Sequence, residues 1–200
     1  EKLKLAHRVD WFDETGPEYP FEVSLLKDQV SVTLDTTGAG LNKRGYRKLT
    51  AKAPLRETLA AALIQLSVWN PDRVLVDPFC GSGTIPIEAV MIGRNMAPGR
   101  HREFKFQEWP QHDPAVWRQA IEEADDTVRD EDTAVIGYDI DSEVLSLARY
   151  HARRAGVENN IHFQQQDIAK LSSQRQYGCI ITNPPYGERS GDRTEAERLY

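Results

Sequence analysis

The spacing of apolar residues predicts helices and strands that alternate from residue 55 towards the end of the chain. Apolar side chains recur three or four positions apart in three stretches, which predicts helices from Leu55 to about Asn70, through Ile85–Ile92, and from Asp141 or Ser142 to Gly156. Short apolar runs predict buried strands at Val74–Val76, Ala134–Tyr138, Ile161–Gln165 and Cys179–Thr182. Because such alternation is typical of parallel sheets wrapped by helices, we expect an α/β fold with a mostly parallel sheet.

The first forty residues follow a different pattern. Phe21–Leu26 and Gln29–Leu34 are strand-like runs joined at Lys27-Asp28, which predicts a β-hairpin. A lone hairpin is marginally stable, so this one should belong to a larger module or pack on the domain that follows. Residues 93–133 form a second irregular region, an insertion whose aromatic side chains we expect to pack into a small satellite core rather than stack on bases.

The composition is that of a globular domain. The chain has 200 residues, 40% of them hydrophobic, with 31 Asp and Glu against 25 Lys and Arg and a formal net charge of −6. No apolar run approaches the roughly 20 residues that span a bilayer. We therefore expect a cytoplasmic protein without a membrane partner.

The charge is unevenly distributed along the chain. Seven acidic residues and one arginine between Glu122 and Asp132 account for the whole net charge. The stretch from Leu41 to Arg56 instead holds six basic residues and no acidic one. A charged run is as often a solvated face as a binding surface, but it leaves a nucleic-acid partner open. The candidate RNA contacts are Lys43, Arg44, Arg47 and Lys48.

A glycine-containing loop follows the first buried strand and opens a helix. It reads Asp77-Pro78-Phe79-Cys80-Gly81-Ser82-Gly83-Thr84, and its glycines would let a ligand approach the backbone at the carboxyl end of the strand. Position 86 is Pro and no Gly-Lys-Ser/Thr follows, which disfavours dinucleotide and Walker phosphate sites. Asp77 points to a cationic ligand group, although a tight structural turn explains the loop about as well.

Two further acidic residues follow the next strands. Asp139 ends the strand within Gly137-Tyr138-Asp139-Ile140-Asp141, where its carboxylate could accept hydrogen bonds from ribose hydroxyls while Asp141 or Ser142 caps the helix. Asp167, after the third strand, could accept a hydrogen bond from an adenine amino group. The alternatives are a helix cap for Asp139 and a plain loop carboxylate for Asp167.

The last predicted strand leads into Asn183-Pro184-Pro185-Tyr186-Gly187. Together with the three preceding motifs, in this order, it resembles the S-adenosylmethionine-dependent amino methyltransferases. The resemblance implies a Rossmann-like class I methyltransferase fold with S-adenosylmethionine as cofactor. The residues it assigns to cofactor binding are Asp77, Phe79, Cys80, Gly81, Gly83, Thr84, Asp139, Asp167 and Asn183.

The chemistry of the fourth motif fits transfer to an exocyclic amine, whose lone pair is delocalised into the base. The Asn183 side-chain oxygen and the Pro184 carbonyl would each accept a hydrogen bond from the amine. These bonds would favour a pyramidal nitrogen whose lone pair points at the sulfonium methyl group. Tyr186 would stack on a flipped-out base. The predicted catalytic residues are thus Asn183, Pro184 and Tyr186, with no metal ion.

Additional segments narrow the resemblance. Leu41-Asn42-Lys43-Arg44-Gly45-Tyr46-Arg47 and the stretch 53–62 are similar to the bacterial THUMP-containing RNA methylases, whose members are similar to the large-subunit rRNA guanine-N2 methyltransferases. This implies that residues 1–46 are the C-terminal end of a THUMP module with its connector. Residues 47–200 would be the front part of the methyltransferase domain, with the insertion 93–133. The fold normally has seven strands, so the domain is expected to be cut after its fourth.

The implied reaction is methylation of guanine N2 in 23S ribosomal RNA, and three alternatives stand beside it. Adenine-N6 methylation of RNA or DNA uses the same fourth motif. Cytosine-C5 methylation needs a cysteine nucleophile, but Cys80 and Cys179 both read as structural. A non-catalytic RNA-binding module would need only the basic stretch. The sequence leaves the oligomeric state open.

Overall fold

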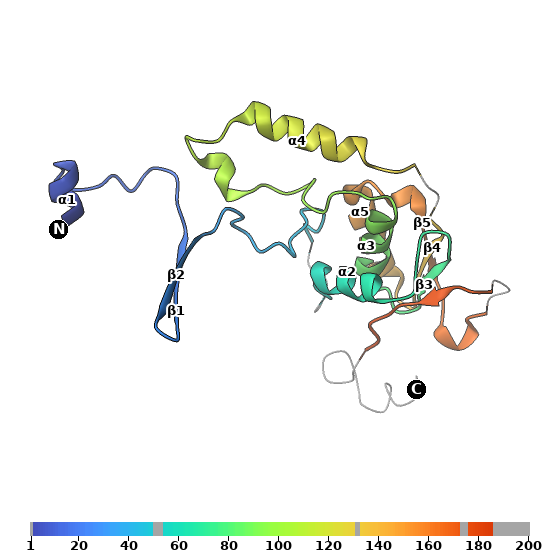
Figure 1. Ribbon diagram of the computed structural model, residues 1–200. Helices are drawn as coiled ribbons and strands as arrows, with labels where there is room; N and C mark the ends of the chain where they lie inside the picture. Colours follow the sequence, from blue (N-terminus) through green and yellow to red (C-terminus); the bar gives the residue numbers. More distant parts are fainter. Residues whose placement is uncertain (1, 50–53, 131–132, 173–175, 186–200) are drawn as a thin grey trace. The chain divides into compact units, whose positions relative to one another are not determined.

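The computed structural model describes residues 2–49, 54–130, 133–172 and 176–185. The chain divides into two compact units (Figure 1). The first comprises Glu1–Ala39 with Phe104–Pro114, and the second comprises Gly40–Glu103 with Ala115–Tyr200.

The first unit contains the predicted hairpin. Its elements are α1 (Lys2–His7), β1 (Phe21–Leu26), β2 (Gln29–Leu34) and the short 3-10 helix η1 (Lys105–Glu108). Strands β1 and β2 pair antiparallel, which confirms the hairpin. Lys27 and Asp28 both have positive φ, 49° and 60°, the left-handed pair that suits a two-residue hairpin turn. Trp109 of the insertion stacks on Tyr19, with 4.9 Å between ring centroids.

The second unit is built on a four-stranded parallel sheet, as the sequence predicts. Its strands are β3 (Leu75–Asp77), β4 (Val135–Asp139), β5 (Ile161–Gln165) and β6 (Cys179–Ile180). The spatial order is β5-β4-β3-β6, and all neighbouring pairs are parallel. The strand order therefore reverses at β3, with β4 on one side and β6 on the other. In open α/β sheets, ligands bind beyond the carboxyl ends of the strands at such a reversal.

Helices α3 (Thr84–Gly93) and α5 (Ser142–Ala155) pack against strands of this sheet, and α2 (Glu57–Leu66) packs against α3. Helix α3 packs between α2 and α5 and also contacts β3 and β4 (Figure 1). Every residue of α3 except Ile92 is buried. The start of α3, which directly follows the glycine loop, is thus anchored in the core.

Helix ends differ in how well the sequence predicts them. Helix α5 begins after Asp141, whose Oδ1 accepts from the backbone N–H of Glu143 at 2.8 Å, and it ends at Gly156, which has φ 74°. Helix α2 ends earlier than predicted. The Ser67 hydroxyl donates to the Ile64 carbonyl at 2.7 Å, and the helix stops before Asn70 is reached.

Helix α4 (Pro114–Asp126) lies within the predicted insertion and buries none of its residues. It carries the first part of the acidic segment found in the sequence. None of the described helices is both long and apolar enough to cross a membrane.

Candidate functional site

The carboxyl ends of β3, β4 and β6 meet at one edge of the sheet and bring three sequence motifs together. The backbone N–H of Gly81 in the glycine loop donates to Oδ2 of Asp139 at 2.9 Å. The Thr182 hydroxyl, just after β6, donates to Oδ1 of Asp77 at 2.6 Å. Segments far apart in sequence are therefore joined by direct hydrogen bonds along this edge of the sheet.

The two glycines of the loop have different roles. Both have positive φ, 52° at Gly81 and 84° at Gly83. A Cβ atom at Gly83 would lie 3.1 Å from the Cβ of Ala148 and 3.1 Å from Cζ of Phe163, so this glycine permits close packing of the loop on α5 and β5. A Cβ at Gly81 would meet no atom within 4 Å. The open side of the loop is thus at Gly81.

Asp77 is the most deeply buried carboxylate of the site, with 2% of its surface exposed. Burial raises its pKa to about 7. The hydrogen bonds from Thr182 and from the Phe79 backbone N–H lower the pKa, but by less than burial raises it. Its Oδ1 thus accepts from two protein donors and braces the loop against the segment after β6. Contact of Asp77 with a cationic ligand group stays a prediction.

Neighbouring Cys80 is also buried, and desolvation raises the pKa of its thiol. A protonated, buried thiol is a poor nucleophile, so the geometry supports a structural role for Cys80. Phe79 is half-buried and Thr84 is buried at the first position of α3.

Asp139 is half-buried and uses both carboxylate oxygens within the protein. Oδ2 accepts from Gly81, and Oδ1 accepts from the backbone N–H of Asp141 at 3.0 Å. The helix cap falls to Asp141, so the capping alternative does not account for Asp139. Asp167 precedes the 3-10 helix η3 (Ile168–Lys170), where its Oδ1 accepts from the backbone N–H of Ala169 at 2.9 Å. Contacts of these carboxylates with ribose or adenine stay predictions.

The fourth motif follows β6 after Ile181 and Thr182. The backbone N–H of Ile181 donates to the Val76 carbonyl at 3.1 Å, and Asn183 and Pro184, which come directly after Thr182 in the chain, are half-buried. Tyr186, predicted to stack on the target base, lies outside the described residues.

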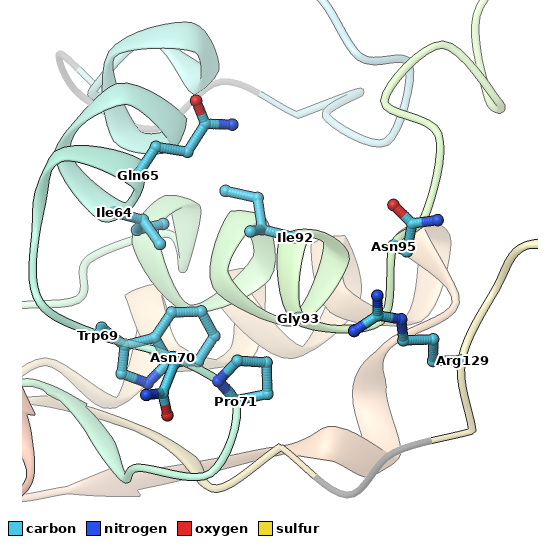
Figure 2. Close-up of a pocket in the computed structure, with 9 residues that line it drawn as sticks. All are labelled: Ile64, Gln65, Trp69, Asn70, Pro71, Ile92, Gly93, Asn95 and Arg129. Carbon is cyan, nitrogen blue, oxygen red and sulfur yellow. The ribbon is translucent and has the colours of Figure 1, made fainter.

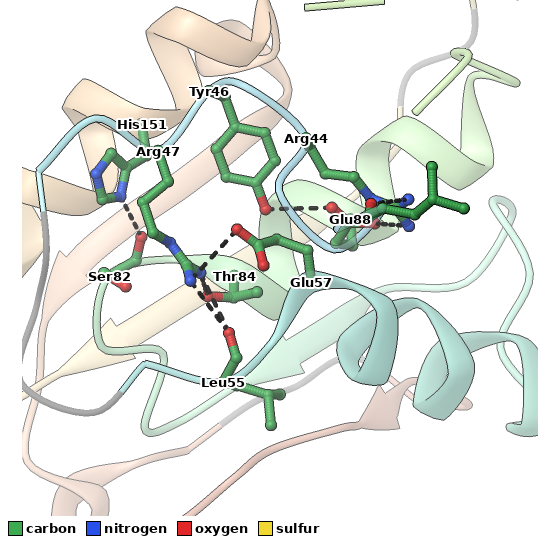
Figure 3. Close-up of polar contacts among 10 residues, drawn as sticks. Arg44, Tyr46, Arg47, Leu55, Glu57, Ser82, Thr84, Glu88 and His151 are labelled. Carbon is green, nitrogen blue, oxygen red and sulfur yellow. Dashed lines mark hydrogen bonds and ion pairs between the residues drawn. The ribbon is translucent and has the colours of Figure 1, made fainter. Parts of the chain in front are cut away.

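The four candidate RNA contacts of the basic stretch divide into two inward arginines and two outward lysines. The side chains of Arg44 and Arg47 are only 12% and 13% exposed; Arg44 pairs with Glu88 at 3.5 Å and Arg47 with Glu57 at 3.3 Å (Figure 3). Lys43 and Lys48 are exposed. Sequence reasoning missed both glutamates, because nothing in their own helical segments indicates which distant cations they meet.

A cavity of about 230 Å³ lies away from this edge, where α2 and α3 end (Figure 2). None of the predicted site residues line it. Its lining residues are Ile64, Gln65, Trp69, Asn70, Pro71, Ile92, Gly93, Asn95 and Arg129.

Comparison with known proteins assigns the chain to a family. Residues 44–200 match UPF0020, the RMKL-like methyltransferase domain, and the chain belongs to this family. YpsC of Bacillus subtilis (strain 168), named as a proposed RNA methyltransferase, is 46% identical over 203 residues. That match takes in all of this chain but 53% of YpsC, so the chain spans about half the length of this relative.

Solved structures agree on the fold. A crystal structure of a predicted N6-adenine-specific DNA methylase from Listeria monocytogenes str. 4b F2365 has a TM-score of 0.92 at 45% identity. SMU.472, named as a proposed methyltransferase and complexed with SAH, has a TM-score of 0.88 at 43% identity. Each match covers 100% of this chain and 53% of the solved chain. The α/β architecture is therefore that of class I methyltransferases.

Proposed function

We propose that this chain is part of an S-adenosylmethionine-dependent RNA methyltransferase that methylates the exocyclic N2 amine of a guanine, in 23S ribosomal RNA. The observation that carries the proposal is the convergence at one sheet edge. The Gly81–Asp139 and Asp77–Thr182 hydrogen bonds join the glycine loop both to the tip of β4 and to the segment that contains Asn183. A donor bound at the loop would therefore lie next to an amine held by Asn183.

The residues around the loop fit S-adenosylmethionine. The open side of Gly81 lets a ligand approach the backbone, and the Asp139 carboxylate beside it suits ribose hydroxyls. The cofactor of the related SMU.472 complex, SAH, is the demethylated product of this donor. Bound there, the cofactor would supply a sulfonium methyl group. The residues proposed to hold it are Asp77, Phe79, Cys80, Gly81, Gly83, Thr84, Asp139, Asp167 and Asn183.

The chain's own part in the chemistry is to orient the amine. The Asn183 side-chain oxygen and the Pro184 carbonyl would each accept one N–H of the exocyclic amine, which directs the nitrogen lone pair towards the donor. The two consecutive prolines fix the backbone that presents these acceptors. Tyr186 would stack on the extruded base, which offsets part of the unstacking cost.

RNA is the proposed substrate, on three grounds. The name of YpsC gives it as an RNA methyltransferase. Two of the candidate RNA contacts in the basic stretch, Lys43 and Lys48, are exposed and can reach phosphates. The resemblance of residues 41–47 and 53–62 to the THUMP-containing RNA methylases implies that residues 1–46 are the end of a THUMP module with its connector, and that the methyltransferase domain begins at residue 47. A cytoplasmic location accords with this assignment.

A second candidate is methylation of adenine N6. It is favoured by the name of the Listeria relative and by the Asn183-Pro184-Pro185 motif, which serves either exocyclic amine. The third candidate, a non-catalytic RNA-binding module, would need no cofactor.

The deciding experiment uses the protein at its natural length. Calorimetry with S-adenosylmethionine tests for the cofactor, and mass spectrometry of nucleosides from ribosomal RNA of cells with and without the protein identifies base and atom. We expect cofactor binding and loss of an N2-methylguanosine when the protein is absent. Loss of N6-methyladenosine instead would select the second candidate, and absence of cofactor binding would contradict any methyltransferase.

Asn183→Ala tests the amine-orienting role. The variant should lose methyl transfer to a much greater extent than it loses cofactor affinity, because the other proposed cofactor contacts remain. Asn159→Ala, at an exposed position in the 3-10 helix η2 (Glu158–Asn160), is the matched control and should keep full activity. Turnover retained in the Asn183 variant would refute the role.

A further inference from the structure

The connector that enters the second unit directs three side chains, Arg44, Tyr46 and Arg47, towards carboxylates of α2 and α3. We name residues 44–47 the strap. Tyr46 is 1% exposed, and its hydroxyl donates to Oε1 of Glu88 at 3.1 Å, while Arg44 reaches Oε2 of the same carboxylate (Figure 3). Burial and the nearby Glu57 charge raise the pKa of Glu88, while the Arg44 charge and both bonds lower it. The strap is thus fastened to the middle of α3.

Arg47 fastens the strap to the start of the same helix. Its guanidinium group donates to the Thr84 hydroxyl, and two of its nitrogens donate to the Leu55 carbonyl at 3.3 Å each (Figure 3). It also pairs with Oε1 of Glu57, which is 4% exposed. Thr84 follows Gly83 directly, so this one group joins the start of α2, the start of α3 and the glycine loop.

The positive charge of Arg47 lies where it is electrostatically unfavourable by itself. The amino ends of helices carry partial positive charge, so a cation at the starts of α2 and α3 is unfavourable unless an anion accompanies it. Glu57 supplies that anion at the first position of α2. The hydrogen bonds of the Arg47 guanidinium group are directed inward to the Thr84 hydroxyl and the Leu55 carbonyl. This arrangement positions the surrounding backbone and leaves few N–H donors for an RNA phosphate.

We propose that Arg47 is a positioning residue for the cofactor site, and that it holds the glycine loop in its binding form through Thr84 rather than contacting RNA. A second fastening lies beside it. The ring of His151 in α5 forms a hydrogen bond between Nδ1 and the Ser82 carbonyl at 3.2 Å, and its centroid is 6.5 Å from that of Tyr46. The loop is therefore supported at Ser82 from α5 and at Thr84 from the strap. The cofactor in this proposal rests on the proposed function.

The test compares Arg47→Met with its exposed neighbour Lys48→Met in the protein at its natural length. Arg47→Met should weaken S-adenosylmethionine binding by about tenfold or more, as expected when a hydrogen bond to a charged group is lost. It should leave the RNA affinity and its salt dependence within about twofold of the parent. Lys48→Met should show the opposite pattern, with unchanged cofactor affinity and weaker RNA binding.

Thr84→Val supplies a second variant that removes the hydroxyl partner of Arg47. Because Thr84 is also one of the residues proposed to hold the cofactor, its coupling with Arg47→Met is what reports on the positioning role. If Arg47 acts through Thr84, the effects of the two substitutions on cofactor affinity should be far from additive in the double variant. Strict additivity, or an Arg47→Met variant that loses RNA affinity but keeps cofactor affinity, overturns the proposal. If Arg47→Met does not fold, unchanged cofactor affinity in Thr84→Val overturns it as well.

Hydrogen exchange on the free protein separates this proposal from the proposed function. Amides of the glycine loop, residues 79–84, should exchange faster in Arg47→Met and at the parental rate in Lys48→Met. A parent that binds no S-adenosylmethionine would contradict the proposed function. Unchanged exchange in Arg47→Met would contradict the positioning role, whatever the ligand.

Discussion

Replacement of Asp77 by Asn should give the protein a larger free energy of unfolding than its parent in alkaline solution. This difference should grow as the pH rises from acidic to alkaline. Burial raises the pKa of Asp77 from 3.8 to about 7 in the folded protein. This difference corresponds to about 4 kcal/mol, because one pKa unit is worth about 1.36 kcal/mol. The Asn side chain keeps an oxygen that can accept from Thr182 and from the Phe79 backbone.

The sign follows from which state loses its proton first. As the pH rises above about 4, the unfolded chain ionises Asp77 while the folded protein keeps it protonated, so the parent loses stability until about pH 7 and then stays level. The neutral amide of the Asp77→Asn variant carries no such penalty. Between about pH 5 and pH 8 the stability of Asp77→Asn relative to the parent should therefore rise by about 3 kcal/mol.

Urea unfolding of both proteins at about pH 5, 6, 7 and 8 measures this gap, and groups that the two proteins share cancel in the difference. Asp72→Asn, which removes an exposed carboxyl group before β3, is the matched control for the loss of one carboxyl. A gap that stays constant with pH would mean that folding does not raise the pKa of Asp77. Asp77, which joins the glycine loop to Thr182, would then be ionised in the folded protein, and the reasoning from burial would be wrong.

Two further outcomes are expected. Asp139→Asn should weaken S-adenosylmethionine binding by about tenfold, because it removes the charge that accepts from Gly81 and faces the proposed ribose; calorimetry measures it, and unchanged affinity would remove Asp139 from the site. Lys43→Glu with Lys48→Glu should weaken RNA binding and lower the salt slope by about two, one for each phosphate that is no longer neutralised. Filter binding across a salt series measures the slope, and an unchanged slope would make these lysines a solvated surface.

Much of the fold could be predicted from local signals. The strand Ile161–Gln165, the hairpin turn at Lys27-Asp28 and the closure of α5 at Gly156 lie where the sequence indicates, because apolar period, turn residues and caps act within a few positions. The predicted end of α2 is wrong, since the Ser67 side chain stops the helix before the proline signal.

The sequence predicted the motifs that form the candidate site, but only some of the contacts that their residues make. The motifs around Gly81, Asp139 and Asn183 follow successive strands, and parallel strands place their carboxyl ends at one edge, so their convergence could be expected from the sequence. The bond between Asp77 and Thr182 joins positions 105 residues apart, and no local pattern indicates it.

The sequence by itself determined the alternating strands and helices from residue 55 onward and which motifs share the ligand edge, because periodicity, caps and the parallel direction of the strands are local or topological properties. It did not indicate helices α1 and α4. It could not decide which of the four candidate RNA contacts in and beside the strap are buried and which are exposed, because the four basic residues look alike in the sequence. Tertiary structure alone decided that Arg44 and Arg47 turn inward to Glu88 and Glu57 while Lys43 and Lys48 stay in solvent. The physical reason is that a guanidinium group is buried only where distant carboxylates and carbonyls compensate its charge, and packing alone brings those partners near.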